Sequence, residues 1–364
     1  MKIVIHLIVG LVWLALSLSA AAAPLDALLT ALPEKASSLG FVELGLDRMN
    51  GSLDFFKVRD KDPATVGTRT GDYRGAHVAG SVLVGNGLWL SGSLWQRAID
   101  TAADTYHYDS WQVSGLYRFI EAAEHRPAVA LRLAAWGNRA AQTETTTPVT
   151  VPGAILNTVK VTAPADRQLQ ADLVGTWMPM PNLDVSAMLG VGATQLSYGA
   201  LTATTKRNGC DYNLAFNGND IYGSLAAPCN SSGGVIQQFY DRSGDYGVDV
   251  VKEIAWHGAF AQTGVNLAWR SEPWTLVAGY VFLVVRRDAV DSILASRGKP
   301  VHTKNQNVTL EADYRFHPHL SGFVRTQLSS NLFFNDIPVT YNSATSERFG
   351  HRYSLYTIGL RAEF

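Results

Sequence analysis

From residue 39 to the end, the chain alternates apolar residues with small or polar ones in segments of about ten residues, the length of a tilted membrane-spanning strand. Successive side chains of a β-strand point to opposite faces, so a period of two predicts strands with one apolar and one polar face. We predict twelve strands, an even number that lets an antiparallel sheet close with both chain ends on one side. The predicted strands are residues 39–58, 74–85, 88–99, 108–119, 128–139, 166–177, 183–196, 254–269, 274–286, 304–316, 320–333 and 351–364.

Short and long connections alternate between these strands. Tight turns are predicted at residues 86–87, 178–182, 270–273 and 317–319, and long polar segments at residues 100–107, 142–165, 197–248, 288–302 and 335–350. A barrel in an outer membrane has short periplasmic turns and long external loops, whereas a soluble sandwich has no reason to sort its loops in this way. The first strand has an alternative boundary, because residues 50–52 (Asn-Gly-Ser) could form a hairpin turn.

The last predicted strand shows the alternation most clearly. Tyr356, Ile358, Leu360, Ala362 and Phe364 share one face, and Tyr353, Thr357, Gly359, Arg361 and Glu363 share the other. A lysine or arginine on the lipid face costs about 2 to 4 kcal/mol at the midplane, so we assign the first set to lipid and the second to the lumen. Aromatic residues gather at the turn ends of the strands and predict a periplasmic interface girdle. They are Tyr117, Phe119, Trp177, Trp269, Trp274, Tyr314, Phe316 and Phe364.

The first 22 residues predict a secretory signal peptide. They carry one lysine, an apolar stretch from Ile3 to about Leu18 and a run of small residues suited to cleavage after Ala22. An uncleaved membrane anchor is the alternative. Residues 23–38 follow as a short periplasmic segment with one predicted helix at residues 24–36. That helix could plug the periplasmic mouth, but we favour a loosely held leader.

Composition supports export and adds one crosslink. The chain has 364 residues, 47% apolar and 17% charged, and a formal net charge of -1, so nothing indicates a nucleic-acid partner. Its two cysteines, Cys210 and Cys229, lie in the Gly- and Asn-rich insertion at residues 197–248 and predict one disulfide in a large external loop. A metal site would need further ligands, which that stretch lacks. This loop could enter the lumen, cap the mouth or form a binding surface.

The final residues, YSLYTIGLRAEF, together with the signal peptide, resemble those of bacterial outer-membrane β-barrel proteins. The resemblance implies an all-β, antiparallel up-and-down barrel over residues 39–364. It also implies that Ile358, Leu360 and Phe364 form the signal read by the barrel-assembly machinery. It is a resemblance to the class and carries over no functional residue.

Charged residues predicted to face the lumen are balanced, with seven of each sign, and therefore indicate no ion preference. The basic set is Arg97, Arg118, Arg132, Arg270, Arg315, Arg325 and Arg361, and the acidic set is Glu43, Asp47, Asp172, Asp184, Glu311, Asp313 and Glu363. Twelve strands lie between barrels filled by side chains and wide porins. We therefore favour a narrow passive channel for small polar solutes. The predicted lining is Arg97, Arg118, Arg132, Asp172, Glu311, Asp313, Arg325 and Arg361.

Two other classes of function stay open. Charges of both signs could instead pair and close the lumen, leaving a structural barrel or one that binds a ligand or partner through its external loops. A barrel hydrolase is the third class: His319-Leu320-Ser321 matches the triplet of barrel lipases, and Asp60, Asp62, His107 and Asp109 could suit a barrel protease. The triplet falls at a periplasmic turn, so we predict no catalytic residue. We also predict no cofactor and no metal site, and outer-membrane lipid as a partner.

Overall fold

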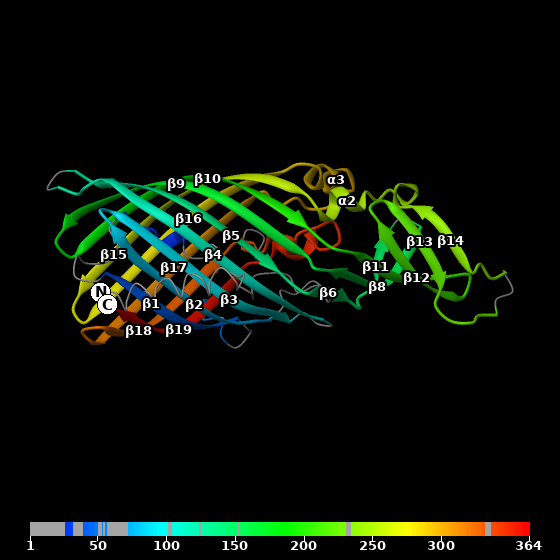
Figure 1. The fold of residues 1–364 in the computed structure, drawn as a ribbon, viewed down its shortest axis with the longest axis horizontal. Helices are drawn as coiled ribbons and strands as arrows, with labels where there is room; N and C mark the ends of the chain where they lie inside the picture. The colour runs from blue at the N-terminus through cyan, green and yellow to red at the C-terminus, as the bar shows by residue number, and fades with distance from the viewer. Residues whose placement is uncertain are drawn as a thin grey trace.

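Twelve strands form a closed antiparallel barrel in the computed structural model, which describes residues 26–31, 39–49, 53, 55–56, 72–100, 104–123, 126–151, 153–230, 234–331 and 336–364 (Figure 1). The last strand, β19, pairs with the first, β1, so the sheet has no free edge. Closure pairs the backbone groups that hydrocarbon could not solvate. The predicted fold class is confirmed. The barrel strands are β1 (Gly40–Met49), β2 (Asp72–Gly85), β3 (Leu88–Asp100), β4 (Thr105–Ile120), β5 (Ala128–Arg139), β9 (Ala165–Met180), β10 (Leu183–Ser197), β15 (His257–Ser271), β16 (Trp274–Arg287), β17 (Lys304–His317), β18 (Leu320–Ser329) and β19 (Tyr353–Glu363).

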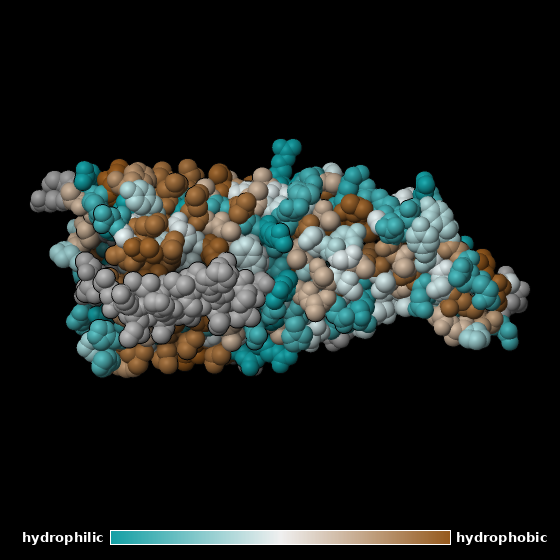
Figure 2. All heavy atoms as spheres, in the orientation of Figure 1, coloured by the Kyte–Doolittle hydropathy of each residue, from teal (hydrophilic) through white to brown (hydrophobic). Residues whose placement is uncertain are grey.

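The outer surface of the barrel is apolar where membrane is expected. Figure 2 shows this surface along the half that carries the short turns and the carboxyl terminus, with polar residues beyond it. Ile358, for example, is 64% exposed, whereas its neighbour Thr357 is buried and faces inward. An apolar surface of this size would be unfavourable in water but is stable in contact with lipid. The other large exposed apolar residues on barrel strands include Leu44, Leu133, Leu169, Leu189, Val191, Val265 and Val324.

A second, seven-stranded sheet extends beyond the barrel at the opposite end from the carboxyl terminus (Figure 1). Its strands come from the two connections at residues 142–165 and 197–248, which we predicted as long polar loops without strands. That prediction was wrong because these stretches also alternate with a period of two, as in Leu201, Ala203 and Thr205, and pair with each other. The strands are β6 (Gln142–Thr145), β7 (Val149–Val151), β8 (Ala154–Thr162), β11 (Leu201–Arg207), β12 (Cys210–Asn217), β13 (Asp220–Leu225) and β14 (Gln238–Arg242).

The helical elements are short, and among the described residues none is long and apolar enough to cross a membrane. Within the described residues, two α-helices and three 3-10 helices lie in the connections near the second sheet. One further 3-10 helix, η1 (Asp26–Leu28), precedes the barrel. The other elements are η4 (Ser243–Tyr246), α2 (Val250–Ile254), α3 (Val290–Ser296), η5 (Pro338–Thr340) and η6 (Ser346–Gly350).

Residues 26–31 lie inside the barrel, against β15, β16 and β17. Our preference for a loosely held periplasmic leader was therefore wrong for this segment, because Asp26 and Ala31 are buried among inward-facing side chains. The structure has a single 3-10 turn in place of the described part of the predicted helix. The signal peptide predicted at residues 1–22 lies outside the described residues.

Two further boundaries differ from prediction. Strand β1 ends at Met49, and Leu53, Phe55 and Phe56 are not in a strand, so the predicted extension to residue 58 was wrong. Residues 50–52 lie outside the described part, so the alternative hairpin there stays a prediction. Strand β3 continues to Asp100 and β4 begins at Thr105, so the connection between them is shorter than predicted. Their polar ends pair with each other although they project past the apolar band.

Candidate functional site

A network of ion pairs joins inward-facing side chains of β1, β17, β18 and β19. Arg325 donates to Glu43 at 2.9 Å and to Glu311 at 2.6 Å. Arg361 contacts the same two carboxylates, at 2.7 and 2.9 Å, and also Asp313 at 3.1 Å. The two guanidiniums therefore share two carboxylates, and Arg361 also contacts a third. Buried charges are stable only when they are paired and hydrogen-bonded, and these contacts provide both.

His77 of β2 extends this network across the wall. One ring nitrogen lies 3.0 Å from Asp47 and the other 3.1 Å from Glu43. The ring lies directly over Gly45 of β1, where a Cβ atom would collide with it. Neither His77 nor Asp47 is among the eight residues predicted to line the lumen. Asp47 was recognised as inward-facing from the alternation, but no sequence signal pairs it with a histidine.

A second network involves the N-terminal segment inside the barrel. Arg132 of β5 contacts Asp26 at 2.7 Å and Asp172 of β9 at 2.8 Å. Gln262 of β15 and Gln170 of β9 both donate to Asp26, at 2.9 and 3.0 Å. Asp26 thus links β5, β9 and β15, which lie within four consecutive strands of the barrel wall.

The remaining predicted lining residues also occupy inward positions. Arg97 of β3 is buried with its guanidinium 5.3 Å from the centre of the Trp95 ring. Arg118 of β4 lies near the turn end and contacts Glu121 at 2.9 Å. Sequence alternation thus located the inward face of these strands, although it did not identify the partners.

Apolar side chains fill the external half of the interior. Trp256, just before β15, donates its indole N–H to the carbonyl oxygen of Tyr341 at 2.8 Å. The guanidinium of Arg287 lies 5.1 Å from the Trp256 ring and 3.8 Å from the Tyr341 ring. Val290 and Leu294 of α3 are fully buried in the same cluster. The connections at this end therefore pack over the mouth of the barrel.

The interior described here is packed with side chains. An aqueous lumen would leave its lining accessible to water, but Arg132, Asp172 and Arg325 are only 3%, 1% and 2% exposed. A cavity between His77 and Arg97 has a volume of about 10 Å³, no more than one water molecule requires. These side chains contact partners on the same or nearby strands and do not line a wide passage.

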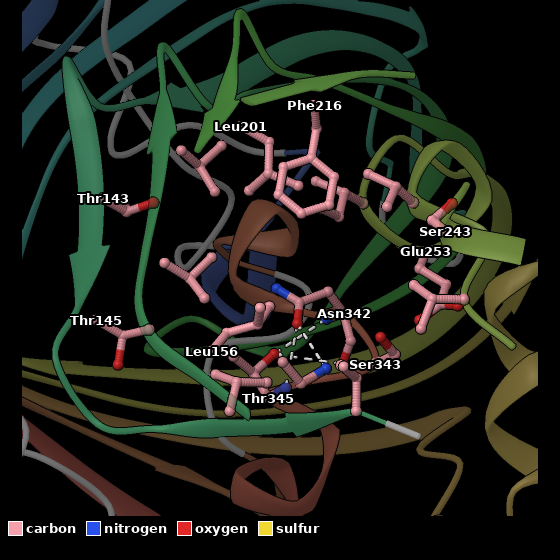
Figure 3. Close-up of a pocket in the computed structure, with 18 of the residues that line it drawn as sticks. Thr143, Thr145, Leu156, Leu201, Phe216, Ser243, Glu253, Asn342, Ser343 and Thr345 are labelled. Carbon is pink, nitrogen blue, oxygen red and sulfur yellow. Dashed lines mark hydrogen bonds between the residues drawn. The ribbon is translucent and has the colours of Figure 1, made fainter. Parts of the chain in front are cut away.

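A much larger cavity lies outside the barrel, between the second sheet and the connections over the mouth. Its volume is about 1410 Å³. Leu201 and Phe216 point into it from the sheet, while Asn342, Ser343 and Thr345 face them from the connection between β18 and β19 (Figure 3). The hydroxyl and amide groups of that connection bond to one another, which holds this wall in shape.

The sheet gives the cavity an apolar wall because its strands alternate. Leu201 of β11 is opposite Phe216 of β12, and both line the cavity, whereas the next pair, Thr202 and Ala215, lies on the other face. The disulfide between Cys210 and Cys229 joins β12 to the connection between β13 and β14, as ordinary pairing in an exported chain predicts. Other apolar lining residues are Leu156, Val159, Val161, Leu214, Ile221 and Phe239.

Most charged residues at this cavity are paired with each other. Arg297 contacts Glu253 through two nitrogens, and the hydrogen bond to Glu253 raises the pKa of Arg297. Arg207 lies 3.4 Å from Asp241, which also accepts a hydrogen bond from Tyr246 at 2.7 Å. Burial and then this bond to a carboxylate raise the pKa of Tyr246, so its hydroxyl stays a donor. The walls therefore present little uncompensated charge.

The predicted hydrolase residues do not form a catalytic group. Ser321 is buried and donates to Asp313 at 3.0 Å, while the His319 ring lies on an exposed turn beside His317. His107 is exposed on the outer face of β4, and Asp109 lies 3.7 Å from Arg139. Asp60 and Asp62 lie outside the described residues. Groups of three or more His, Cys, Asp or Glu suited to a metal ion are absent from the described part of the chain.

A closed twelve-stranded sheet with a lipid-facing outer surface has one physical setting. The chain is an outer-membrane β-barrel. Its predicted location in the bacterial outer membrane follows from this architecture.

Comparisons with known proteins add no family. No protein-family model matches the chain, and no curated protein matches it. Among solved structures, it is similar to the translocator domain of the autotransporter NalP from Neisseria meningitidis, at 11% identity and a TM-score of 0.46, covering 89% of this chain and 87% of that one. The NanC porin matches at 10% identity and a TM-score of 0.41, covering 89% of this chain and 100% of that one. The CymD monoaromatic hydrocarbon channel matches at 10% identity and a TM-score of 0.42, covering 94% of this chain and 93% of that one.

Proposed function

We propose that this protein is a non-conducting barrel that holds an apolar or weakly polar ligand in the cavity above its external mouth. This is the second class left open by the sequence, and it replaces the narrow channel that we favoured there. The observation that carries it is the cavity of about 1410 Å³ between the apolar face of the second sheet and the connections over the barrel.

Packing of the interior argues against a passive channel. Small polar solutes need a hydrated path, and rings of charge line such paths only when they are solvated. Here Arg325 and Arg361 bond to carboxylates on two strands, β1 and β17, and Asp26 occupies the space beside Arg132. Charge balance in the lumen is thus better explained by mutual pairing than by solute selection.

The cavity walls indicate the chemistry of the ligand. Pockets for drug-sized molecules have volumes of about 300 to 1,000 Å³, so this one suits a larger or elongated molecule. Leu201, Phe216 and Ile221 provide apolar contact, while Arg297 and Arg207 already have carboxylate partners. An uncharged ligand with a long apolar part fits these walls better than an ion.

Conductance tests the closed barrel directly. We expect refolded protein in planar bilayers to give no steady conducting steps, because its inward-facing charges are paired and buried. Regular steps from protein shown to be folded by heat-modifiable gel migration would refute this part of the proposal. They would restore the channel that the charge pattern first suggested.

Binding of an apolar probe tests the cavity. N-phenyl-1-naphthylamine, added to protein held in amphipol, should fluoresce when it enters. Phe216→Asp should weaken its binding at least about tenfold, because a buried carboxylate without a partner is unfavourable beside an apolar ligand. The matched control is Ala215→Asp, one residue away on the opposite face of β12.

A second variant guards against an unfolded sheet. Ala344→Trp places a large side chain on the opposite wall of the cavity, where it should exclude the probe without adding charge. Trypsin resistance of the second sheet checks that each variant is folded. Equal binding by wild type, Phe216→Asp and Ala344→Trp would show that the cavity is not the site.

A further inference from the structure

Four basic side chains form a distinct face at the external end of the barrel. Arg167 is on β9, His257 on β15, Arg286 on β16 and Lys304 on β17, and all four are exposed on outward positions. We refer to these four residues as the basic face. The strands that carry them, with β10 between β9 and β15, are consecutive in the barrel.

Strand register places the basic face in one continuous row. Gln195 of β10 lies opposite both Arg167 and His257. For the other neighbours, the residue opposite one member lies two positions from the next member, and a shift of two keeps a side chain on the same face. Shifts of this kind follow the tilt of strands in a barrel. The pairs are Arg167 with Gln195, Gln195 with His257, Ala259 with Arg286, and Val284 with Lys304.

The basic face begins where the lipid-facing surface ends. Leu169 lies two residues from Arg167 in the direction of the short turns, and Val284 lies two residues from Arg286 in the same direction. Both side chains are large, apolar and exposed. Figure 2 shows the same change on the side in view, where apolar surface gives way to polar surface midway along the molecule. The four basic side chains are therefore at the height of lipid headgroups.

Most of this charge lacks a carboxylate partner. His257 lies 3.5 Å from Asp288, but within the described part of the chain Arg167, Arg286 and Lys304 form no ion pair. Elsewhere at this end, Arg74 of β2 and Arg139 of β5 are also exposed, but they lie 3.5 Å from Asp100 and 3.7 Å from Asp109. Arg48 of β1 is exposed opposite Arg74. The basic face differs from these residues because its members lie on a row of neighbouring strands and most of them form no ion pair within the described residues.

We propose that the basic face binds an outer-leaflet lipid that carries two phosphates, such as a diphosphorylated acyl disaccharide. Arg286 and Lys304 are on neighbouring strands and suit one phosphate. Arg167 is three strand spacings from Arg286, or about 14 Å at the usual 4.8 Å per strand, and suits a second. A glycerolipid with one phosphate would satisfy only one of these positions. Acyl chains would lie against Leu169 and Val284.

Native mass spectrometry of the full folded chain in detergent tests the proposal. The probes are a diphosphoryl acyl disaccharide, the same lipid with one phosphate removed, and phosphatidylglycerol. Replacing Arg167, Arg286 and Lys304 together with glutamine should weaken binding of the diphosphoryl lipid about a hundredfold, given the usual attraction of each basic residue to an anionic surface. All three side chains are exposed, so the barrel should still fold, as gel migration would confirm.

The control variant removes three charges elsewhere, outside the cavity, by glutamine substitutions at Lys160 and Arg242 of the second sheet and Lys252 of α2. It should bind the diphosphoryl lipid as wild type does. An equal loss in the control would overturn the proposal by attributing binding to net charge. It is overturned as well if the monophosphoryl lipid or phosphatidylglycerol binds wild type as tightly, or if millimolar inorganic phosphate displaces the lipid.

Discussion

Arg325→Ala is the most informative single substitution, because it distinguishes a packed interior from a hydrated one. Arg325 is 2% exposed, contacts Glu43 and Glu311, and lies 4.8 Å from the centre of the Phe323 ring. Removing one partner of a buried ion pair costs about 3 to 5 kcal/mol, since it leaves buried charge uncompensated. Arg361 still contacts both carboxylates, so we expect a loss of about 3 kcal/mol.

The assay is equilibrium unfolding in urea of protein refolded into phosphatidylcholine vesicles, followed by tryptophan fluorescence. Arg139→Ala is the matched control on the same barrel. Its guanidinium is half exposed and lies 3.7 Å from Asp109, and such surface pairs contribute at most about 1 kcal/mol. If Arg325→Ala costs no more than Arg139→Ala, water reaches the network and the packed interior is wrong.

A double substitution tests the reason for the loss. Arg325→Met combined with Glu311→Gln removes a cation and a carboxylate together, and leaves Arg361 to pair with Glu43 and Asp313. We expect it to recover more than half of the stability lost in Arg325→Ala, because replacement of both partners avoids an unpaired buried charge. Simple addition of the two single effects would contradict the pairing that the distances indicate.

Four further predictions concern other parts of the chain. Replacing Cys210 and Cys229 with serine should let trypsin cut the second sheet while the barrel stays intact on gels, because a crosslink over 19 residues contributes about 3 kcal/mol. Asp26→Ala should lower the urea midpoint, since Arg132 and two glutamines lose a bonding partner. Burial and then the Arg287 guanidinium lower the pKa of His302 from 6.5, so the unfolded chain binds the proton more tightly. Stability should fall as the pH drops below 6.5, and the difference in urea midpoint between about pH 7.5 and 5.5 should shrink in His302→Gln. Phe364→Ala should reduce the fraction of folded barrel in cell envelopes, measured by heat-modifiable migration.

The barrel could be predicted from sequence because lipid imposes a strong rule on each strand. In β19, Ile358 and Leu360 are exposed on one face while Thr357 and Arg361 are buried on the other, as the alternation requires. The energetic difference between the two faces is large for charged side chains, so few sequences violate the pattern. The number of alternating segments of about ten residues or more then gives the strand count, because the strands of the second sheet are shorter.

The second sheet was missed because the same alternation has more than one cause. Leu201, Leu214 and Phe216 cover an apolar interior shared with the cavity, and they recur with the same period as lipid-facing residues. Asn and Gly in the short turns between these strands resemble those of an irregular loop. Period two therefore identifies a strand but not the environment of its apolar face.

The position of residues 26–31 was beyond prediction for a different reason. Asp26 pairs with Arg132, more than a hundred residues away, and Ala31 donates its N–H to Thr176 at 2.7 Å. Sequence gives each residue's chemistry but not which carboxylate reaches which guanidinium. A short segment before a barrel offers no pattern that separates a leader from a plug.

An open and a closed lumen also share the same charge count, which explains why the sequence left both possible. The contacts of Arg325 distinguish the two cases. Arg325 of β18 contacts Glu311 on the adjacent strand β17, and it also contacts Glu43 on β1, because only β19 lies between β18 and β1. Arginine suits this arrangement, since its planar group bonds two carboxylates at once. Pairing between near neighbours leaves Arg325, Arg361 and Arg132 without a free charge to attract a solute, so the binding proposed for this protein is on surfaces outside the lumen.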